Sequence, residues 1–355
     1  MHGGDIYRNK VTLDFSVNIN SKGIPFRVKE ALKNAVSKCT CYPDIQSEQL
    51  KKDIAEMLQT EKEDLICGNG ASELFLALIR ALQPKKVLIP VPSFYGYEKV
   101  TAATECETIY YRMKEKDGFR LTEEFLTYLT EETDVVFLTN PNNPVGNCIH
   151  PSLLEKIVQI CSNKNIYVVL DECFIEFTKK GEDYTFLYKT KKYPNVIVVR
   201  AFTKIFSIPG VRLGYLVCRD QKLKGKIEDQ LPEWNLSVFA QEAGCAATKE
   251  KGFVRETVEY HAREREYLIE ELRKRQIKVY EGEANFLLFY MQMDLKEELL
   301  KKQILIRDCS DFRGLKKGYF RIAVKKREEN ELLIQAIDEI QKKKGQEAHG
   351  TSNDV

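Results

Sequence analysis

The sequence predicts an α/β protein with two parts. In the larger part a mostly parallel sheet lies between helices, and the smaller part is an α+β domain. Up to about residue 250, short runs rich in valine, isoleucine and leucine alternate with longer segments whose apolar residues have helical spacing. Such alternation is typical of a parallel sheet covered by helices on both faces. After residue 250 the pattern changes to a long charged helix followed by further strands.

Five apolar runs are expected to be buried strands of the large sheet. They are residues 85–91, 133–139, 165–171, 195–202 and 212–218. Two segments, 72–82 and 152–164, place apolar residues at helical spacing and are expected to be covering helices. We therefore predict a large domain over residues 45–250.

The smaller domain is expected to combine both ends of the chain, residues 1–44 with 251–342. Its C-terminal part has an amphipathic helix pattern over 251–275, strand patterns over 284–291, 304–309 and 319–324, and a last helix pattern over 327–344. The polar residues 343–355 are expected to form a disordered tail.

Composition excludes several classes of protein. The 355 residues are 43% hydrophobic and carry a net charge of +2, so neither nucleic acid nor an anionic membrane is expected as a partner. No apolar run approaches the roughly 20 residues of a membrane helix, and the N-terminus lacks the apolar core of a secretory signal. A cytoplasmic location is therefore expected. The ten cysteines contain no C-x-x-C pair, so we expect free thiols and no metal site.

Several loops that follow predicted strands contain unusual polar or aromatic groups. Gly70, Ala71 and Ser72 open a predicted helix, where free backbone N–H groups bind anions, although a simple N-cap explains the same pattern. Phe94 follows the strand at 85–91 and is placed to stack on a flat ligand, although core packing is the commoner use of an aromatic ring. Asn143 lies in the rigid turn "TNPNNPVG".

An acid and a lysine follow the next two strands. Asp171 directly follows the run "YVVL", and a carboxylate buried there needs a cationic or N–H partner, which a protonated heterocyclic nitrogen supplies. Lys204 lies among apolar residues in "RAFTKIFSIPGVRLGY", with Arg212 as a possible phosphate ligand. Lys204 alone could extend along an apolar surface to water. Taken together, the anion site, aromatic ring, amide, acid and lysine are the groups that pyridoxal 5′-phosphate (PLP) requires.

The motifs "NPNNPVG", "LDE" and "TKIFSIPGVRLGY" resemble those of the class I and II aminotransferase superfamily, which are fold-type I PLP-dependent transferases. The resemblance extends from about residue 11 to 340. It implies that Lys204 forms the Schiff base with PLP, that Asp171 partners the pyridine nitrogen and that Asn143 bonds the phenolic oxygen. It also implies that Phe94 and Cys173 contact the two faces of the PLP ring. The implied ligands of the PLP phosphate are Gly70, Ala71, Ser72, Thr203 and Arg212.

A further implication concerns a second subunit. The segment "CYPD" resembles one in which the tyrosine, here Tyr42, reaches the cofactor phosphate of the neighbouring subunit. An ordinary turn aromatic before Pro43 is the alternative. The resemblance therefore implies a homodimer with shared active sites.

Two branches of the superfamily compete, L-threonine-O-3-phosphate decarboxylase and histidinol-phosphate aminotransferase. The N-terminal "HGGDIYR", the C-terminal "ILIRDCSDFRGLKKGYFRIAV" and Phe174, where the aminotransferase has a tyrosine, resemble the decarboxylase. The sequence of segment 231–243 has features of both branches. The resemblance implies decarboxylation of L-threonine O-3-phosphate to (R)-1-aminopropan-2-yl phosphate in cobalamin biosynthesis, and the alternative is histidinol-phosphate or related aminotransfer.

The decarboxylase resemblance also implies a set of substrate ligands. We expect Arg307 and Arg321 to bind the substrate phosphate, with help from His2 and Asn20. Each has a simpler explanation: Arg321 could pair with an acid, His2 could be a mobile terminal residue, and Asn20 could be a turn residue.

Overall fold

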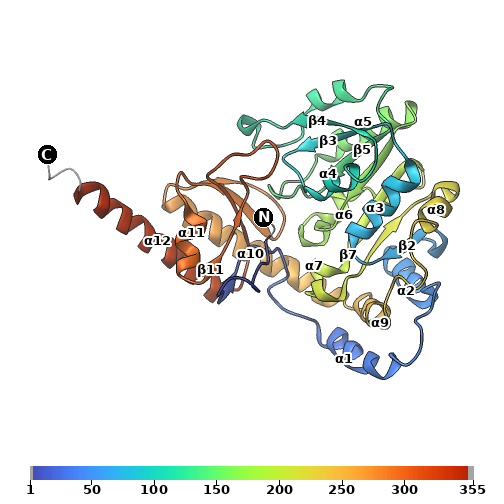
Figure 1. Cartoon of the computed structure of the whole chain (residues 1–355), viewed down its shortest axis with the longest axis horizontal. Helices are drawn as coiled ribbons and strands as arrows, with labels where there is room; N and C mark the ends of the chain where they lie inside the picture. The colour runs from blue at the N-terminus through green and yellow to red at the C-terminus, as the bar shows by residue number, and fades with distance from the viewer. Residues whose placement is uncertain (1–2, 351–355) are drawn as a thin grey trace.

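The computed structural model describes residues 3–350, and its larger part is built on one seven-stranded sheet (Figure 1). The strand order is β2-β8-β7-β6-β5-β3-β4, and all neighbours are parallel except β8, which runs antiparallel to β2 and β7. The bounds are β2 Leu65–Gly68, β3 Lys86–Val91, β4 Glu107–Arg112, β5 Val135–Thr139, β6 Tyr167–Asp171, β7 Val196–Ala201 and β8 Gly214–Val217. The predicted fold class and its five strands are confirmed, whereas β2 and β4 were not predicted.

Alternate side chains of each strand point to opposite faces of this sheet, and helices cover both faces. On one face Val136, Val168 and Val196 pack against α5 (Pro151–Asn163). On the other face Val135 and Val169 pack against α3 (Ala71–Leu82) and α8 (Gln221–Glu228). Continuous apolar strands are therefore explained by helices on both sides.

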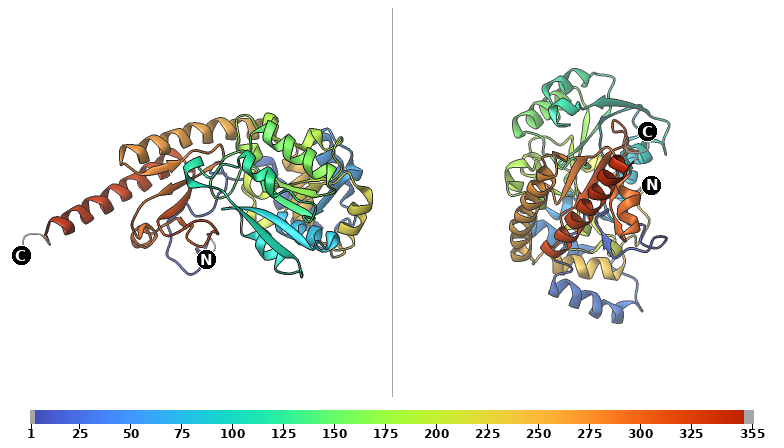
Figure 2. Two further views of the ribbon diagram at one scale, coloured as in Figure 1. Left: turned by 90° about the horizontal axis from the view of Figure 1, so that it is seen from above. Right: turned by 90° about the vertical axis from the view of Figure 1, so that its left-hand side faces the viewer.

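The smaller sheet has four antiparallel strands in the order β12-β13-β10-β9. They are β9 Lys278–Tyr280, β10 Phe286–Tyr290, β12 Arg307–Asp308 and β13 Tyr319–Ala323, and the helices beside them are α10 Lys251–Lys274, α11 Leu295–Lys301 and α12 Arg327–Gly350. The N-terminal β1 (Leu13–Asp14) pairs in parallel with β11 (Ile304–Leu305), so the N-terminal segment lies beside a segment from the C-terminal part of the chain. Figure 2 shows this part beside the larger one, and α10 runs from the larger part to the smaller one.

The remaining helices lie on the larger part or next to the loops of its sheet. They are α1 Phe26–Ala35, α2 Glu48–Leu58, α4 Gly96–Thr101, α6 Gly181–Tyr184, α7 Phe202–Ile205 and α9 Val238–Ala247. Helix α1 packs on α9, and the short α7 directly follows β7. This position of α7 brings the lysine predicted to bind the cofactor to the end of the sheet.

The last helix differs from the expectation of a disordered tail from residue 343. Helix α12 continues to Gly350 and projects away from the body (Figure 1). Lys343, Lys344, Gln346, Glu347 and Ala348 are residue types with high helix propensity, and they continue α12 even though Gly345 and Gly350 lie among them. Within residues 3–350, no helix is both long and apolar enough to cross a membrane.

Candidate active site

One cavity of about 220 Å³ lies where the strand ends of the large sheet face the small sheet. Thr139 at the end of β5, Asp171 at the end of β6 and Ala201 at the end of β7 all line it. Ligands of open α/β sheets bind beyond these carboxyl ends. The predicted site residues that line this cavity are Gly70, Ala71, Ser72, Phe94, Asn143, Asp171, Cys173, Thr203, Lys204, Arg212, Arg307 and Arg321.

Lys204 is the amine of the cavity. It lies on α7, directly after β7, because the chain turns into this short helix at Phe202. Removal from water lowers the pKa of its ammonium to about 8, and the positive charges of Arg321 and Arg212 act in the same direction. A lysine with a lowered pKa is partly unprotonated near neutral pH and can act as a nucleophile.

Asp171 is a buried carboxylate held by two donors. The Tyr97 hydroxyl donates to its Oδ2 at 2.6 Å, and the backbone N–H of Cys173 donates to its Oδ1 at 2.9 Å. Burial raises the pKa of Asp171, and these two hydrogen bonds oppose that rise. Tyr97 is itself fully buried, stacked on Phe137 with ring centroids 4.8 Å apart. The sequence did not identify Tyr97 as a partner of this acid.

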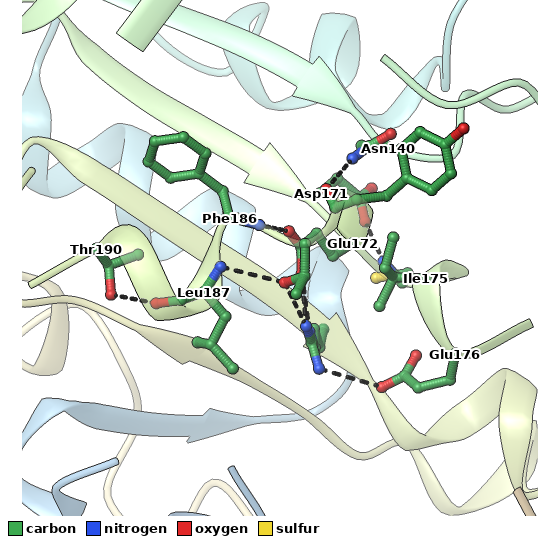
Figure 3. Close-up of polar contacts among 12 residues, drawn as sticks. Asn140, Asp171, Glu172, Ile175, Glu176, Phe186, Leu187 and Thr190 are labelled. Carbon is green, nitrogen blue, oxygen red and sulfur yellow. Dashed lines mark hydrogen bonds and ion pairs between the residues drawn. The ribbon is translucent and has the colours of Figure 1, made fainter. Parts of the chain in front are cut away.

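A second acid, Glu172, does not line the cavity but forms a buried ion pair, drawn in Figure 3. Its Oε2 accepts from Arg200 Nε at 3.0 Å and Nη2 at 2.7 Å, and its Oε1 accepts from the backbone N–H of Phe186 at 2.8 Å. Thr185 donates to Oε2 at 2.7 Å. Glu172 directly follows β6 and Arg200 lies on β7, so the ion pair links the end of β6, which carries Asp171, to the end of β7, which leads into the helix that carries Lys204.

The start of helix α3 forms an anion cradle. Gly70 has φ +77°, and a Cβ built there would stand 2.6 Å from Nη2 of Arg212. Only a residue without a side chain lets this guanidinium lie against the helix start. Arg212 is held by the carbonyls of Pro209 at 3.1 Å and Asn69 at 3.4 Å. Backbone N–H groups, the helix dipole and one arginine are groups that can together bind a phosphate.

Two arginines form the opposite wall. Arg307 on β12 is the direct register partner of Arg321 on β13, so antiparallel pairing brings residues distant in sequence side by side. Arg321 donates to Asn143 Oδ1 and, at 2.8 Å, to the carbonyl of Ser16. Its Nε is buried without a partner among residues 3–350. Burial lowers the pKa of Arg321 to about 10.

Asn20 was predicted to bind substrate, but the structure places its side chain elsewhere. Its amide nitrogen donates to the carbonyl of Ile205 at 2.7 Å and to Thr257 Oγ1 at 3.0 Å, and it does not line the cavity. Asn18 lines the cavity instead, and its Oδ1 is buried without a hydrogen bond among the described residues. The chain turns at Asn18, where the N–H of Ile19 bonds the carbonyl of Val17 at 3.0 Å. The asparagine that lines the cavity is therefore Asn18, two residues before Asn20.

Tyr42 does not line this cavity. Tyr42 is 81% exposed and packs against Trp234 with ring centroids 4.9 Å apart. An exposed tyrosine outside its own chain's cavity is compatible with a contact to a second subunit. His2 lies outside the described residues.

Comparisons with known proteins agree with this geometry. A model of the "Aminotransferase class I and II" family matches residues 10–337. A protein of Caldanaerobacter subterraneus, provisionally assigned as a threonine-phosphate decarboxylase, is 40% identical over 95% of this chain and 92% of its own length. The threonine-phosphate decarboxylase of Salmonella typhimurium is 34% identical over 95% of each chain. The solved histidinol-phosphate aminotransferase of Clostridium acetobutylicum has a TM-score of 0.88 at 30% identity, covering 93% of this chain and 99% of its own.

The cofactor of these enzymes is PLP, and the groups of the cavity fit it. The Lys204 amine suits the aldehyde, the Asp171 carboxylate suits a protonated ring nitrogen, and the Gly70–Arg212 cradle suits the phosphate. Within residues 3–350, no group of three or more histidine, cysteine or acidic side chains is arranged to hold a metal ion.

Proposed function

We propose that this chain, which belongs to the class I and II aminotransferase family, decarboxylates a phosphorylated amino acid. The proposed reaction converts L-threonine O-3-phosphate to (R)-1-aminopropan-2-yl phosphate, as a step of cobalamin biosynthesis. The observation that carries the proposal is the pair of buried arginines, Arg307 and Arg321, on adjacent strands of the cavity wall. The two decarboxylase relatives support the same substrate class.

Bound PLP supplies an electron sink for the bond that breaks at the substrate α-carbon. The residues of this chain have distinct roles in the proposal. Lys204 holds the cofactor and moves protons at the α-carbon, Asp171 keeps the ring nitrogen protonated, and Asn143 bonds the phenolic oxygen. Phe94 and Cys173 contact the two ring faces. The cofactor phosphate is held by Gly70, Ala71, Ser72, Thr203 and Arg212.

The two arginines are suited to a phosphate dianion. A guanidinium presents parallel N–H donors that match phosphate oxygens, and two adjacent guanidiniums bind a double charge better than a single one. With both arginines on the phosphate, the α-carboxylate has no dedicated arginine among the cavity residues described and is free to leave as carbon dioxide. Asn18 is placed to accept a hydrogen bond from the substrate through its free Oδ1.

Phe174 supports decarboxylation over amino transfer. Its ring lines the cavity and packs edge-on against Phe286, with centroids 5.1 Å apart, so this position presents no hydroxyl to the cofactor. Histidinol-phosphate aminotransfer remains the second candidate, favoured by the high structural similarity to the Clostridium enzyme. Transfer of an amino group from histidinol phosphate to 2-oxoglutarate would support that candidate.

Arginine substitution tests phosphate recognition. Arg321→Ala is expected to weaken binding of L-threonine O-3-phosphate by about 100-fold, in the range found when one partner of a buried charge pair is removed. Binding of unphosphorylated L-threonine should change much less. Arg313→Ala is the matched control because Arg313 is partly exposed and pairs with Glu98 at 3.0 Å outside the cavity. Equal losses for both amino acids in Arg321→Ala would mean that this arginine binds the carboxylate.

We also propose a homodimer in which Tyr42 of each subunit reaches the cofactor phosphate of the other. Lys204→Ala and Tyr42→Ala proteins should each have little activity alone. After unfolding and refolding together, they should regain about a quarter of wild-type activity, because half of the dimers are mixed and each of these has one complete site. No recovery in a verified mixed dimer would place Tyr42 outside the partner's site.

A further inference from the structure

The two cavity arginines differ in what neutralises them. Among the described residues, the hydrogen-bond acceptors of Arg321 are neutral oxygens, those of Asn143 and Ser16. Arg307 contacts a carboxylate, since its Nη2 lies 2.9 Å from Oδ1 and 3.0 Å from Oδ2 of Asp311. The Arg307 side chain is 8% exposed, whereas that of Asp311 is 42% exposed. A buried guanidinium is therefore paired with a half-exposed acid at the edge of the cavity.

Arg307 does not depend on Asp311 for its position. Its Nη1 also donates to the carbonyl of Asp308, and its guanidinium carbon lies 5.0 Å from the ring centroid of Phe312. The β12–β13 ladder fixes its backbone opposite Arg321. The bond to the Asp308 carbonyl, the contact with the Phe312 ring and the strand ladder thus orient Arg307 even when Asp311 turns away.

The exposed fractions of the two side chains indicate that Asp311 can be replaced as the partner of Arg307. A buried cation needs an anionic or hydrogen-bonding partner, and among the residues that the structure describes the carboxylate in contact with Arg307 is that of Asp311. A half-exposed carboxylate returns to water at little cost, because it is already partly hydrated. A phosphate dianion that enters the cavity can therefore take the place of Asp311 on Arg307.

We propose that Asp311 is an internal competitor for the anionic group of the substrate at Arg307. Arg321 is then the fixed anion contact and Arg307 the exchangeable one. This inference rests on the proposed function, since it needs a substrate with an anionic group at Arg307. Its consequence is weaker binding of every ligand that carries such a group. The proposed product retains the phosphate, so the same competition speeds product release.

The test is the sign of one affinity change in the full-length protein loaded with PLP. Asp311→Asn keeps the shape of the side chain and removes its charge. The probes are O-phosphoethanolamine and ethanolamine, which differ only in the phosphate, and their dissociation constants are measured by calorimetry. Asp311→Asn should bind O-phosphoethanolamine about fivefold more tightly, in line with the strength of a partly exposed ion pair. Ethanolamine binding should not change.

The matched control is Glu271→Gln. Glu271 also lies four residues from its arginine, Arg275, at 2.7 Å, but this pair lies at the C-terminal end of α10, away from the cavity. Its removal should leave both probes unaffected. A thermal unfolding midpoint within the range of the control shows that Asp311→Asn is folded.

The possible results separate the two proposals. Weaker or unchanged binding of O-phosphoethanolamine by Asp311→Asn would mean that Asp311 orients Arg307 or does not act on it, and either result overturns the inference. Such a result leaves the proposed function standing as long as the wild-type protein prefers the phosphorylated amine. A wild-type protein without that preference would overturn the proposed function, and the inference with it.

Discussion

Replacing Tyr97 by phenylalanine should destabilise the ionised form of Asp171. The substitution removes the 2.6 Å hydrogen bond to Oδ2 and leaves the Cys173 N–H as the remaining donor of the two. A hydrogen bond to a charged group contributes about 1.5–3 kcal/mol, so Tyr97→Phe should lower the free energy of unfolding by about 2 kcal/mol at pH values where Asp171 is ionised. PLP affinity should also fall, since a less readily ionised Asp171 is a poorer partner for a protonated ring nitrogen.

The loss of unfolding free energy in Tyr97→Phe should become smaller as the pH falls. Burial raises the pKa of Asp171, and the Tyr97 hydrogen bond opposes this rise, so the variant has a higher folded-state pKa than the wild type. The difference between the two proteins is therefore fully present where Asp171 is ionised. It disappears as the pH falls through the folded-state pKa and the carboxyl becomes protonated.

Urea unfolding of the PLP-free protein between pH 5 and 8 measures this difference, and equilibrium dialysis measures PLP affinity. Tyr111→Phe is the matched control because buried Tyr111 bonds the neutral hydroxyl of Thr122 at 3.1 Å. Its loss should be about 1 kcal/mol at every pH. A Tyr97→Phe loss that is equally independent of pH, with unchanged PLP affinity, would refute the reasoning.

Two further substitutions test other parts of the site. Lys204→Ala should abolish activity and the absorption band of lysine-bound PLP while leaving the unfolding midpoint nearly unchanged; a persisting band would mean that another lysine holds the cofactor. Glu172→Gln should destabilise the protein by about 3–5 kcal/mol because it leaves Arg200 buried without its main charge partner. The double change Glu172→Gln with Arg200→Met should recover most of that loss, and a double variant as unstable as the single one would show that the buried charge is not the cause.

Much of the candidate site follows from the sequence because it lies on strand ends. Asp171 and Lys204 directly follow long apolar runs, and parallel strands bring their carboxyl ends to one edge of the sheet. Their meeting in one cavity therefore needs only the strand pattern. The two unpredicted strands, β2 and β4, are the edge strands of the sheet. They are less apolar or shorter, so their patterns are weaker.

Other features depend on tertiary contacts that no local pattern contains. Asn18 and Asn20 are of the same type, and only the turn at Asn18 decides which one faces the cavity. Tyr97 lies at the start of α4, next to the aromatic residues Phe94 and Tyr95, and only its depth of burial shows that it bonds Asp171. The pairing of Arg307 with Asp311 likewise depends on the local path of the loop after β12.

The central claim is decarboxylation, and carbon dioxide release tests it most directly. The PLP-loaded protein is mixed with L-threonine O-3-phosphate in the absence of any keto acid, and carbon dioxide is counted per active site. The account predicts sustained release over many turnovers, with (R)-1-aminopropan-2-yl phosphate formed in equal amount. An absence of carbon dioxide, together with amino transfer from histidinol phosphate to 2-oxoglutarate in a parallel reaction, would contradict it.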